Sequence, residues 1–324
     1  MLTGGAGFIG SHVAEALLHR GVDLTIVDNL DRFYPRAWKE ANLKEIRQVG
    51  KFELFELDIC DERASREAFA RSRPEIVVHL AARTGVRPSI EQPLPYEQVN
   101  VRGTINLLEL CREYGVTKFL FGSSSSVYGD NPEAPFSEDQ VGLRPISPYA
   151  VTKLAGEMLS YTYAHLFALP VICLRFFTVY GPRQRPDLAI YKFTALMEAA
   201  KAVPIFGDGL TGRDYTYVDD IVAGVLAALE RTPGSEAAGP AFEVFNLGNS
   251  HPVKLADLVD LLEHVTGRKA ILEYQQPQPG DMPLTWANIS KATRLLGYHP
   301  STQLEDGLAR FVSWYRSTAP KRLA

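Results

Sequence analysis

Short apolar runs alternate with amphipathic segments along the first half of the chain. The runs predict five strands, at residues 24–27, 52–57, 76–80, 119–121 and 171–174. Between them, apolar residues recur three and four positions apart, as Val13, Leu17 and Leu18 do, which is typical of helices with one buried face. Strands joined by helical crossovers form a parallel sheet that helices cover on both faces. The pattern therefore predicts an α/β fold built on a doubly wound parallel sheet.

The pattern becomes irregular after residue 175, where prolines and glycines interrupt it. It resumes with a helix near 219–230, a strand near 242–246 and helices near 255–265, 288–296 and 303–315. Residues 231–240 are expected to form a surface loop. We expect two interleaved domains, a larger one of residues 1–175 plus about 212–246, and a smaller, mixed α/β one of about 176–211 plus 247–324.

Three glycines follow the first residues at the spacing G-x-x-G-x-x-G, as Gly4, Gly7 and Gly10. This spacing allows a tight turn, close approach of a pyrophosphate and close packing of a helix on a strand. The helix that begins near Gly10 would direct its N–H groups at the phosphates. A glycine turn without a ligand is the alternative for a lone motif, but the next strand ends in Asp28, 18 residues after Gly10. An acidic residue at this distance from the glycine turn is placed to bind the ribose hydroxyls of a dinucleotide.

The cofactor predicted from these residues is NAD. Asp28 would accept hydrogen bonds from the ribose diol and repel a 2′-phosphate, and no arginine adjoins it in the sequence. Capping of a turn by Asp28 and Asn29 is the alternative role. The following strands end in residues that fit the same cleft, so the larger domain is expected to bind NAD. The expected contacts are Gly4, Gly7, Phe8, Ile9, Gly10, Asp28, Asn29, Asp58, Ile59, Leu80, Ala81 and Ala82.

Only three residues precede Gly4, although a central strand normally leads into such a turn. A buried central strand supplies hydrogen bonds on both sides. We therefore expect either a natural start upstream of Met1 or weak NAD binding and low stability.

Tyr149 and Lys153 stand four residues apart at the start of the predicted helix 148–166 and so share one face of it. A cation beside the phenol favours the phenolate, which predicts a Tyr149 pKa moved from about 10 toward neutrality. Such a phenolate is a general base for alcohol oxidation. The spacing is common on helices, but serines 123–126 follow the fifth strand, whose carboxyl end opens into the cofactor cleft. Helix capping is the other role open to these serines.

Motifs along the whole chain resemble the extended short-chain dehydrogenase/reductase family, in its nucleotide-sugar epimerase and dehydratase branch. They are TGGAGFIGS, DNL, LDICD, HLAA, NVRGT, SSSSVYGD, SPYAVTK, RFFTVYGPRQRPD, IFGDG, RDYTYVDDI, NLGN and QPGDMP. The resemblance implies a Rossmann fold, with Ser124, Tyr149 and Lys153 as the catalytic triad. It also implies Asn100 at the cofactor site, as a support of the active-site helix, beside Tyr149 and Lys153. The implied reaction oxidises C4 of a UDP-sugar, turns the 4-keto sugar over and reduces its other face, so that tightly bound NAD is recycled.

The same resemblance implies the substrate-binding residues of the smaller domain and its surroundings. They are Arg87, Ser125, Ser126, Thr178, Arg185, Phe206, Arg213, Tyr215 and Asp281. Many relatives carry Arg where Gln278 stands, so the diphosphate contact is expected from Arg87 or Arg185 instead.

The substrate is narrowed by comparison within the branch. Dehydratases carry Thr-Asp-Glu before Val-Tyr-Gly, uronate decarboxylases commonly carry Glu at position 126, and glucose epimerases usually carry Asn at position 178. Ser126, Thr178 and residues 177–187 instead resemble the UDP-glucuronate 4-epimerases. The hydroxyls of Ser125, Ser126 and Thr178 would surround a carboxylate, or else the 6-hydroxyl of glucose. UDP-glucose 4-epimerase, UDP-glucuronate decarboxylase and a non-enzymatic NAD-sensing protein stay open as alternatives.

Composition excludes several other classes. The chain has 34 Lys and Arg against 38 Asp and Glu, so its net charge of −4 argues against nucleic acid or a membrane surface as partner. Three widely spaced cysteines and seven scattered histidines predict neither a disulfide framework nor a metal site. No secretory signal or membrane-spanning apolar run occurs, which predicts a cytoplasmic protein. Residues 95–114 and 148–166 resemble helices that pair in dimeric relatives, so we expect a homodimer.

Overall fold

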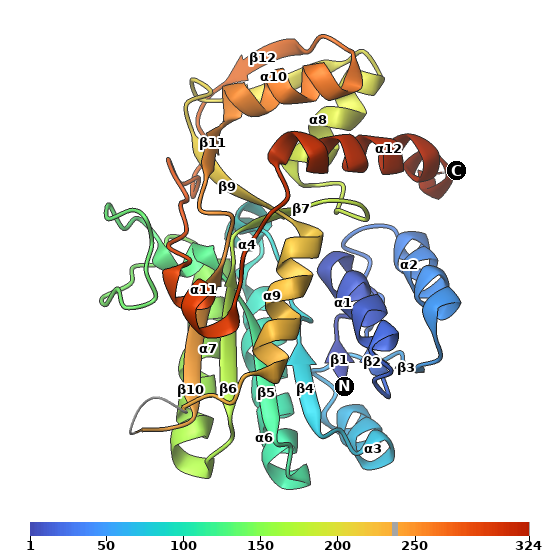
Figure 1. Cartoon of the computed structure of the whole chain (residues 1–324), viewed down its shortest axis with the longest axis vertical. Coiled ribbons are helices and arrows are strands. Elements are labelled where there is room, and N and C mark those ends of the chain that lie inside the picture. The colour runs from blue at the N-terminus through green and yellow to red at the C-terminus, as the bar shows by residue number, and fades with distance from the viewer. Residues whose placement is uncertain (235–238, 324) are drawn as a thin grey trace.

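A seven-stranded parallel sheet forms the base of the computed structural model, which describes residues 1–234 and 239–323, the side chains of 319–323 excepted. Its strands lie in the order β10-β6-β5-β4-β1-β2-β3 (Figure 1). Their bounds are β1 Leu2–Thr3, β2 Thr25–Val27, β3 Glu53–Phe55, β4 Ile76–His79, β5 Lys118–Ser124, β6 Val171–Phe176 and β10 Phe242–Leu247. The strand order reverses direction after β1, so the predicted doubly wound sheet is confirmed.

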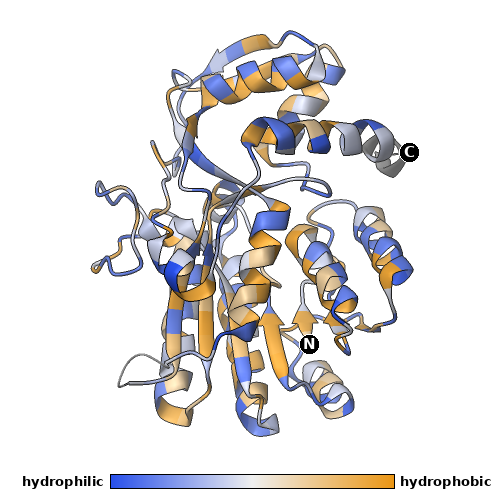
Figure 2. Cartoon of the chain, in the orientation of Figure 1, coloured by the Kyte–Doolittle hydropathy of each residue, from blue (hydrophilic) through white to orange (hydrophobic). Residues whose placement is uncertain are grey.

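Helices cover both faces of this sheet. On one face α1 (Phe8–His19) packs between α2 (Arg36–Val49) and α9 (Val218–Glu230), and on the other α6 (Gly103–Tyr114) packs between α3 (Glu62–Ser72) and α7 (Pro148–Phe167). Successive residues of β5 alternate between these layers, since Leu120 joins the α1 side of the core and Phe119 and Phe121 join the other. Strands buried on both faces are apolar throughout, and Figure 2 shows this in the central strands.

The helices that face the cleft begin and end at identifiable signals. α7 begins at Pro148, where the side chain of Ser147 accepts a hydrogen bond from the Ala150 backbone N–H at 3.2 Å. The predicted helix 95–114 is in fact the end of α5 (Pro93–Glu97), a π-helical turn η1 (Gln98–Arg102) and then α6. The short α4 (Val86–Glu91) and the 3₁₀ turn η2 (Ser125–Tyr128) complete the rim of the cleft.

Smaller sheets lie beyond the carboxyl edge of the large one, among α8, α10 and α12 (Figure 1). One has three strands, β7 (Thr178–Tyr180), β9 (Gly212–Tyr217) and β11 (Pro252–Lys254), and the other pairs β8 (Ala202–Phe206) with β12 (Ile271–Gln275). The helices there are α8 Ala189–Glu198, α10 Leu255–Thr266, α11 Ser290–Leu296 and α12 Leu304–Leu323.

Two sequence-based assignments in this region need comment. β9 falls within residues 212–246, which we assigned to the larger domain, but it pairs with β7 and β11 and not with the large sheet. Strand pairing of this kind joins segments far apart in the chain, which local pattern does not reveal. Of the surface loop expected at 231–240, residues 235–238 lie outside the described part of the chain.

The two-residue strand β1 lies inside the sheet, beside its central strand β4. Its backbone pairs with β2 and β4, and the Leu80 N–H donates to the Thr3 carbonyl at 3.1 Å. The Thr3 hydroxyl also hydrogen-bonds Nδ1 of buried His79 at 2.7 Å. A short strand is thus held by neighbours on both sides, which places the following glycine turn at the middle of the carboxyl edge.

A buried ion pair joins α7 to β6. Arg175 donates to both oxygens of Glu157, at 2.9 and 2.7 Å, and each residue is 4% exposed. The Ser123 hydroxyl donates to the same carboxylate at 2.5 Å. The pair therefore fixes the active-site helix against the end of β5.

Arg175→Met is expected to lower the free energy of unfolding by about 3–5 kcal/mol, because it leaves the Glu157 carboxylate buried without its cation. Urea denaturation followed by circular dichroism measures the change. Arg63→Met is the matched control: its pair with Glu67 has side chains 91% and 65% exposed, and its loss should cost at most about 1 kcal/mol. Equal losses for the two variants would contradict the assigned role.

Candidate active site

One cavity of about 710 Å³ opens at the carboxyl ends of the central strands. Its size is that of a small-molecule or cofactor site. All twelve residues expected from the glycine turn and the strand ends line it, namely Gly4, Gly7, Phe8, Ile9, Gly10, Asp28, Asn29, Asp58, Ile59, Leu80, Ala81 and Ala82. Tyr149 and Lys153 line its other end. Residues spread over more than half of the chain thus share one cleft.

The glycine turn has the shape that a dinucleotide needs. A Cβ on Gly10 would lie 2.1 Å from the Gly4 carbonyl oxygen, and Gly4 itself has φ +73°. These two positions require glycine, so α1 can press directly on the turn. The cap residue Gly7 makes no side-chain bond to α1, and the first turn of the helix carries no acidic residue. Its N–H groups therefore face the cavity and suit a pyrophosphate.

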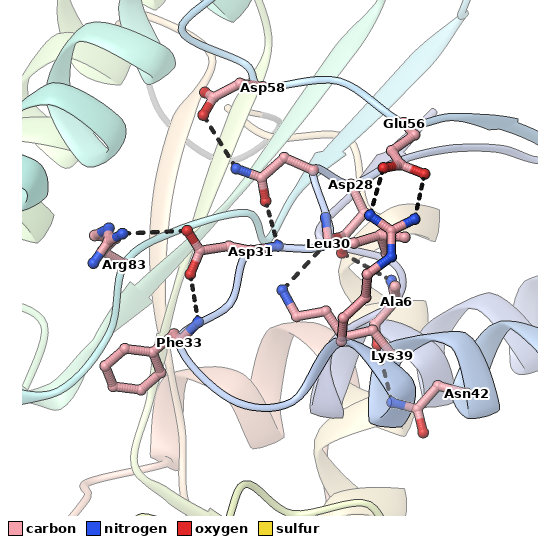
Figure 3. Close-up of polar contacts among 12 residues, drawn as sticks. Ala6, Asp28, Leu30, Asp31, Phe33, Lys39, Asn42, Glu56, Asp58 and Arg83 are labelled. Atoms are coloured by element: carbon pink, nitrogen blue, oxygen red, sulfur yellow. Dashed lines mark hydrogen bonds and ion pairs between the residues drawn. The ribbon is translucent and has the colours of Figure 1, made fainter.

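Asp28 organises the opposite wall of the cavity (Figure 3). Its carboxylate accepts hydrogen bonds from the backbone N–H of Ala6 at 3.1 Å and of Leu30 at 2.9 Å. Asn29 donates to Asp58 at 3.1 Å, which joins the ends of β2 and β3. A carboxylate can accept about four hydrogen bonds, so Asp28 retains acceptor capacity for a ribose diol.

Lys39 is a member of this wall that sequence reasoning missed. Its Nζ lies 3.7 Å from the Asp28 carboxylate, and the residue is 7% exposed and lines the cavity. The expectation that no arginine adjoins Asp28 therefore overlooked a lysine. Lys39 follows Trp38 in the first turn of α2, and both side chains are buried. Burial is unusual for a lysine.

The proposed catalytic side chains meet at the end of β5. Lys153 donates from Nζ to the Gly122 carbonyl at 2.6 Å, and its ammonium lies 5.0 Å from the centre of the Phe121 ring. The Ser124 hydroxyl donates to Ser126 Oγ at 3.1 Å and lines the cavity with Tyr149. α7 and β5 thus bring the three groups to one spot.

The pKa expected for Tyr149 is wrong for the protein by itself. Burial raises the pKa of the phenol, while a hydrogen bond with Ser124 and the charge of Arg185 lower it less. Lys153 adds no such stabilisation, since its ammonium is directed to Gly122. Burial also lowers the pKa of Lys153 to about 8, against the opposing charge of Glu157. Spacing on a helix fixed which residues meet, but the low-polarity surroundings decided the direction of both shifts.

Asn100 lies beside the cavity and does not line it. Its amide oxygen accepts from the Arg83 backbone N–H at 2.7 Å, and its Nδ2 donates to the Arg83 carbonyl at 2.9 Å. The same Nδ2 donates to the Thr152 hydroxyl at 3.0 Å. From its place in the π-helical turn η1, Asn100 therefore connects the segment after β4 with α7.

The predicted substrate residues divide into two groups. Ser125, Ser126, Thr178 and Arg185 line the cavity near the catalytic side chains. Arg185 is held by both oxygens of Asp187, at 2.9 and 2.6 Å, and it also donates to the Thr84 hydroxyl. Three hydroxyls and one guanidinium are thus collected from η2, β7 and the segment after β7.

The second group lies outside the lining of this cavity. Arg87 pairs with Asp281 at 2.7 Å and lies 4.4 Å from the centre of the Phe206 ring. Arg213 is close enough for the charges of Asp281 and Arg87 to act on its pKa, which burial lowers. Tyr215 is buried on the neighbouring strand β9. The group adjoins the cavity through Val86, which lines it and precedes Arg87.

A family model described as GDP-mannose 4,6 dehydratase matches residues 1–311. The chain belongs to this family. The relatives that match this chain include nucleotide-sugar epimerases of the short-chain dehydrogenase/reductase type, so the resemblance inferred from the sequence motifs is confirmed.

Relatives of known name extend over nearly the whole chain. The UDP-glucuronate 4-epimerase of Thermodesulfobacterium geofontis is 42% identical over 316 residues, which cover 97% of this chain and 95% of the relative. The crystal structure of UDP-glucuronic acid 4-epimerase from Bacillus cereus, in complex with UDP-glucuronic acid and NAD, has a TM-score of 0.89, 38% identity and 98% coverage of both chains. That of a UDP-glucose 4-epimerase from Thermotoga maritima, with UDP-glucose, also has a TM-score of 0.89, at 36% identity and the same coverage.

Three further features bear on the site and its setting. The cysteines at positions 60, 111 and 173 are unpaired. No cluster of three or more metal-binding side chains occurs within residues 1–234 and 239–323. Over the same residues no helix is both long and apolar enough to cross a membrane.

Lys153→Met is expected to stabilise the fold at pH 7 and to abolish turnover. The pKa of Lys153 falls from 10.5 to about 8 on folding, so the buried ammonium costs ~3 kcal/mol of folding free energy. The variant removes this cost but also loses the hydrogen bond to Gly122, which is worth ~1 kcal/mol. The penalty is full below pH 8, where both states are protonated, and it fades as the pH rises toward 10.5. Denaturation of both proteins at pH 7 and pH 10 measures it. A gain that grows with pH would contradict the argument.

Proposed function

We propose that the protein catalyses the NAD-dependent C4 epimerisation of UDP-glucuronate to UDP-galacturonate. The observation that carries the proposal is the arrangement of hydroxyl donors, from Ser125, Ser126 and Thr178, beside Ser124, Tyr149 and Lys153 in a cavity that also contains the glycine turn. The names of the relatives support the same reaction. Isomerisation through a 4-keto sugar uses all of these parts.

The glycine turn and the strand ends would hold NAD. The first turn of α1 would face the pyrophosphate, Asp28 the adenosine ribose, and Tyr149 with Lys153 the nicotinamide ribose end. Bound NAD supplies a hydride acceptor and donor, and it ends each cycle unchanged. The named complexes of relatives with NAD support this choice of cofactor.

Tyr149 is the group we assign to proton transfer at the O4 hydroxyl. Its phenol lies at the cavity wall, where burial raises its pKa and the hydrogen bond with Ser124 and the charge of Arg185 offset part of that rise. Ser124 would orient the sugar hydroxyl through the same hydroxyl group that now contacts Ser126. Lys153 is anchored on Gly122, one helical turn after Tyr149 on α7. The phenol would then return the proton when the keto group is reduced.

Retention of the carboxylate distinguishes this reaction from decarboxylation. Oxidation at C4 makes a β-keto acid, which loses carbon dioxide when its C5–carboxylate bond aligns with the carbonyl π system. Hydroxyl donors that hold the carboxylate away from this alignment would prevent the loss. Ser125, Ser126 and Thr178 provide them in the cavity, and hydrogen bonds to a charged acceptor are strong.

Competing activities lack a group that they need. Residues 124–126 are serines, so the carboxylic acid that dehydration requires is absent from this turn, although the family takes its name from a dehydratase. A protein that only senses NAD has no use for Tyr149 and Lys153 brought together. UDP-glucose 4-epimerase is the second candidate, since the Thermotoga maritima structure shares the fold to the same degree.

We assign the nucleotide end of the substrate to the second group of residues. Arg87 and Arg213 carry positive charge beside Asp281, at the rim of the cavity near Val86. Two cations suit a diphosphate, and Phe206 and Tyr215 offer aromatic faces to a base. Arg185 gives two of its donors to Asp187, whereas Arg87 gives one to Asp281, so Arg87 keeps more donors for a diphosphate.

The division into two interleaved domains is also a proposal. We place residues 1–175 and 218–247 in the NAD-binding domain, because β10 is a strand of the large sheet and α9 packs against that sheet. Residues 176–217 and 248–324 then form the substrate-binding domain. The three unpaired cysteines suit a reducing compartment, which supports a cytoplasmic location.

Tyr149→Phe is expected to keep the fold and the bound NAD but to lower turnover by about 10²–10⁴-fold, since only the proton acceptor is lost. Product formation from UDP-glucuronate, followed by NMR, measures turnover, and the melting temperature monitors the fold. Tyr161→Phe, on the exposed side of the same helix, is the control. Turnover of the Tyr149 variant near the wild-type rate would refute the assignment.

Thr178→Ala is expected to slow epimerisation of UDP-glucuronate or to release UDP-pentose, because one donor to the carboxylate is lost. The products are separated by chromatography and identified by NMR. The wild-type protein should convert UDP-glucose slowly or not at all, since a neutral hydroxyl binds these donors less strongly. Equal rates on UDP-glucose and UDP-glucuronate would replace the proposal by the glucose 4-epimerase.

We also propose that the protein is a homodimer that pairs through α7 and α5. Val151, Met158 and Leu166 on α7 are 52–63% exposed and Leu94 on α5 is 77% exposed, which forms an apolar face beside the cleft. Met158→Glu should shift the mass in sedimentation from dimer to monomer, because two buried charges would face each other. A wild-type monomer at micromolar concentration would exclude this part of the proposal.

A further inference from the structure

The adenosine end of the cavity contains a buried cation as well as the expected carboxylate. Lys39 lies 3.7 Å from Asp28 (Figure 3) and is 7% exposed. Its ammonium lies 5.1 Å from the centre of the Tyr34 ring. Asp28 by itself would repel the 2′-phosphate of NADP. A lysine in the same wall would attract it. The preference between the two cofactors must therefore depend on both charges.

We propose that Lys39 is a specificity-determining residue whose charge Asp28 neutralises, so that the pair sets how strongly the protein prefers NAD to NADP. The proposal rests on the assignment of NAD made above. It goes further, because it gives Lys39 a measurable influence on the 2′-position. It also explains why a lysine is tolerated in a site that would otherwise favour NADP.

Two other cations near this wall, Arg36 and Arg83, are already paired. Arg36, at the first residue of α2, donates to both oxygens of Glu56, at 2.7 and 2.8 Å, and to Glu40 at 2.8 Å. Arg83, on the far side of the loop, pairs with Asp31 at 3.2 Å. Arg36 is also 42% exposed at its side chain, against 9% for Lys39. Interactions in the less hydrated position are stronger, so Lys39 acts on this wall more strongly than Arg36 does.

Asp28 has a second duty that decides how the inference is tested. It accepts backbone hydrogen bonds from Ala6 in the glycine turn and from Leu30, whose φ is +49°. Replacement of Asp28 therefore endangers the turn itself. Lys39 makes no such backbone bond among the contacts of the described residues, so the decisive variant changes Lys39 and leaves Asp28 in place.

Lys39→Met preserves the length of the side chain and removes its charge. Asp28 then faces the 2′-phosphate without compensation, and the ratio of the NADPH and NADH dissociation constants should rise about 10-fold. Fluorescence of the dihydronicotinamide measures both constants on the full-length protein without sugar. Lys44→Met, on the exposed face of the same helix, should leave the ratio within about 2-fold, because a charge at the surface is screened.

Asp28→Asn supplies the converse test, since it removes the neutralising charge and retains an acceptor for Ala6. NADPH should then bind about 10-fold more tightly relative to NADH, and Lys39→Met added to this variant should cancel the gain. An unchanged ratio in Lys39→Met, with NADH still bound, would overturn the inference alone. Failure of the wild-type protein to bind either nucleotide would overturn the proposed function and this inference with it.

Discussion

The close contact between α1 and the glycine turn is the constraint on which the rest of the site depends. A Cβ on Gly10 would lie only 2.1 Å from the Gly4 carbonyl oxygen, so this contact is possible only because glycine has no side chain. That contact brings the first turn of α1 over the carboxyl edge of the sheet, with its N–H groups facing the cavity. Asp28 then accepts from Ala6 and locks the turn to the end of β2. A larger residue at either glycine would displace the helix and the phosphate site together.

Stability and chemistry make opposite demands at the other end of the cavity. Lys153 is buried and its pKa falls to about 8, so its charge costs folding free energy at neutral pH. The Arg175–Glu157 pair lies one turn further along α7, and loss of either partner would leave the other charge buried and unpaired. Through Ser123 the same pair also positions the end of β5, which carries Ser124. The active-site helix is thus held in place beside a group that weakens it.

Substrate choice does not follow from the fold. Structures named for UDP-glucuronic acid and for UDP-glucose match this chain with the same TM-score of 0.89. Our proposal distinguishes the two substrates by the hydroxyls of Ser125, Ser126 and Thr178, which line one cavity. Short hydroxyl donors suit a charged acceptor more than a neutral one, and they carry no acid that would promote elimination. The reaction is therefore decided by local chemistry on a shared scaffold.

The sequence by itself determined most strands of the sheet, the bounds of several helices and the twelve residues of the glycine turn and strand ends that line the cavity. Periodicity and glycine spacing are local, and parallel strands bring their carboxyl ends to one edge, so Gly4, Asp28 and Tyr149 could be placed in one cleft. Only the tertiary structure decided which charges meet. It put Lys39 beside Asp28, directed Lys153 to Gly122, paired Arg87 with Asp281 and moved β9 into the small sheet. These outcomes depend on burial and on contacts between segments far apart in the chain, and neither is encoded in any local pattern.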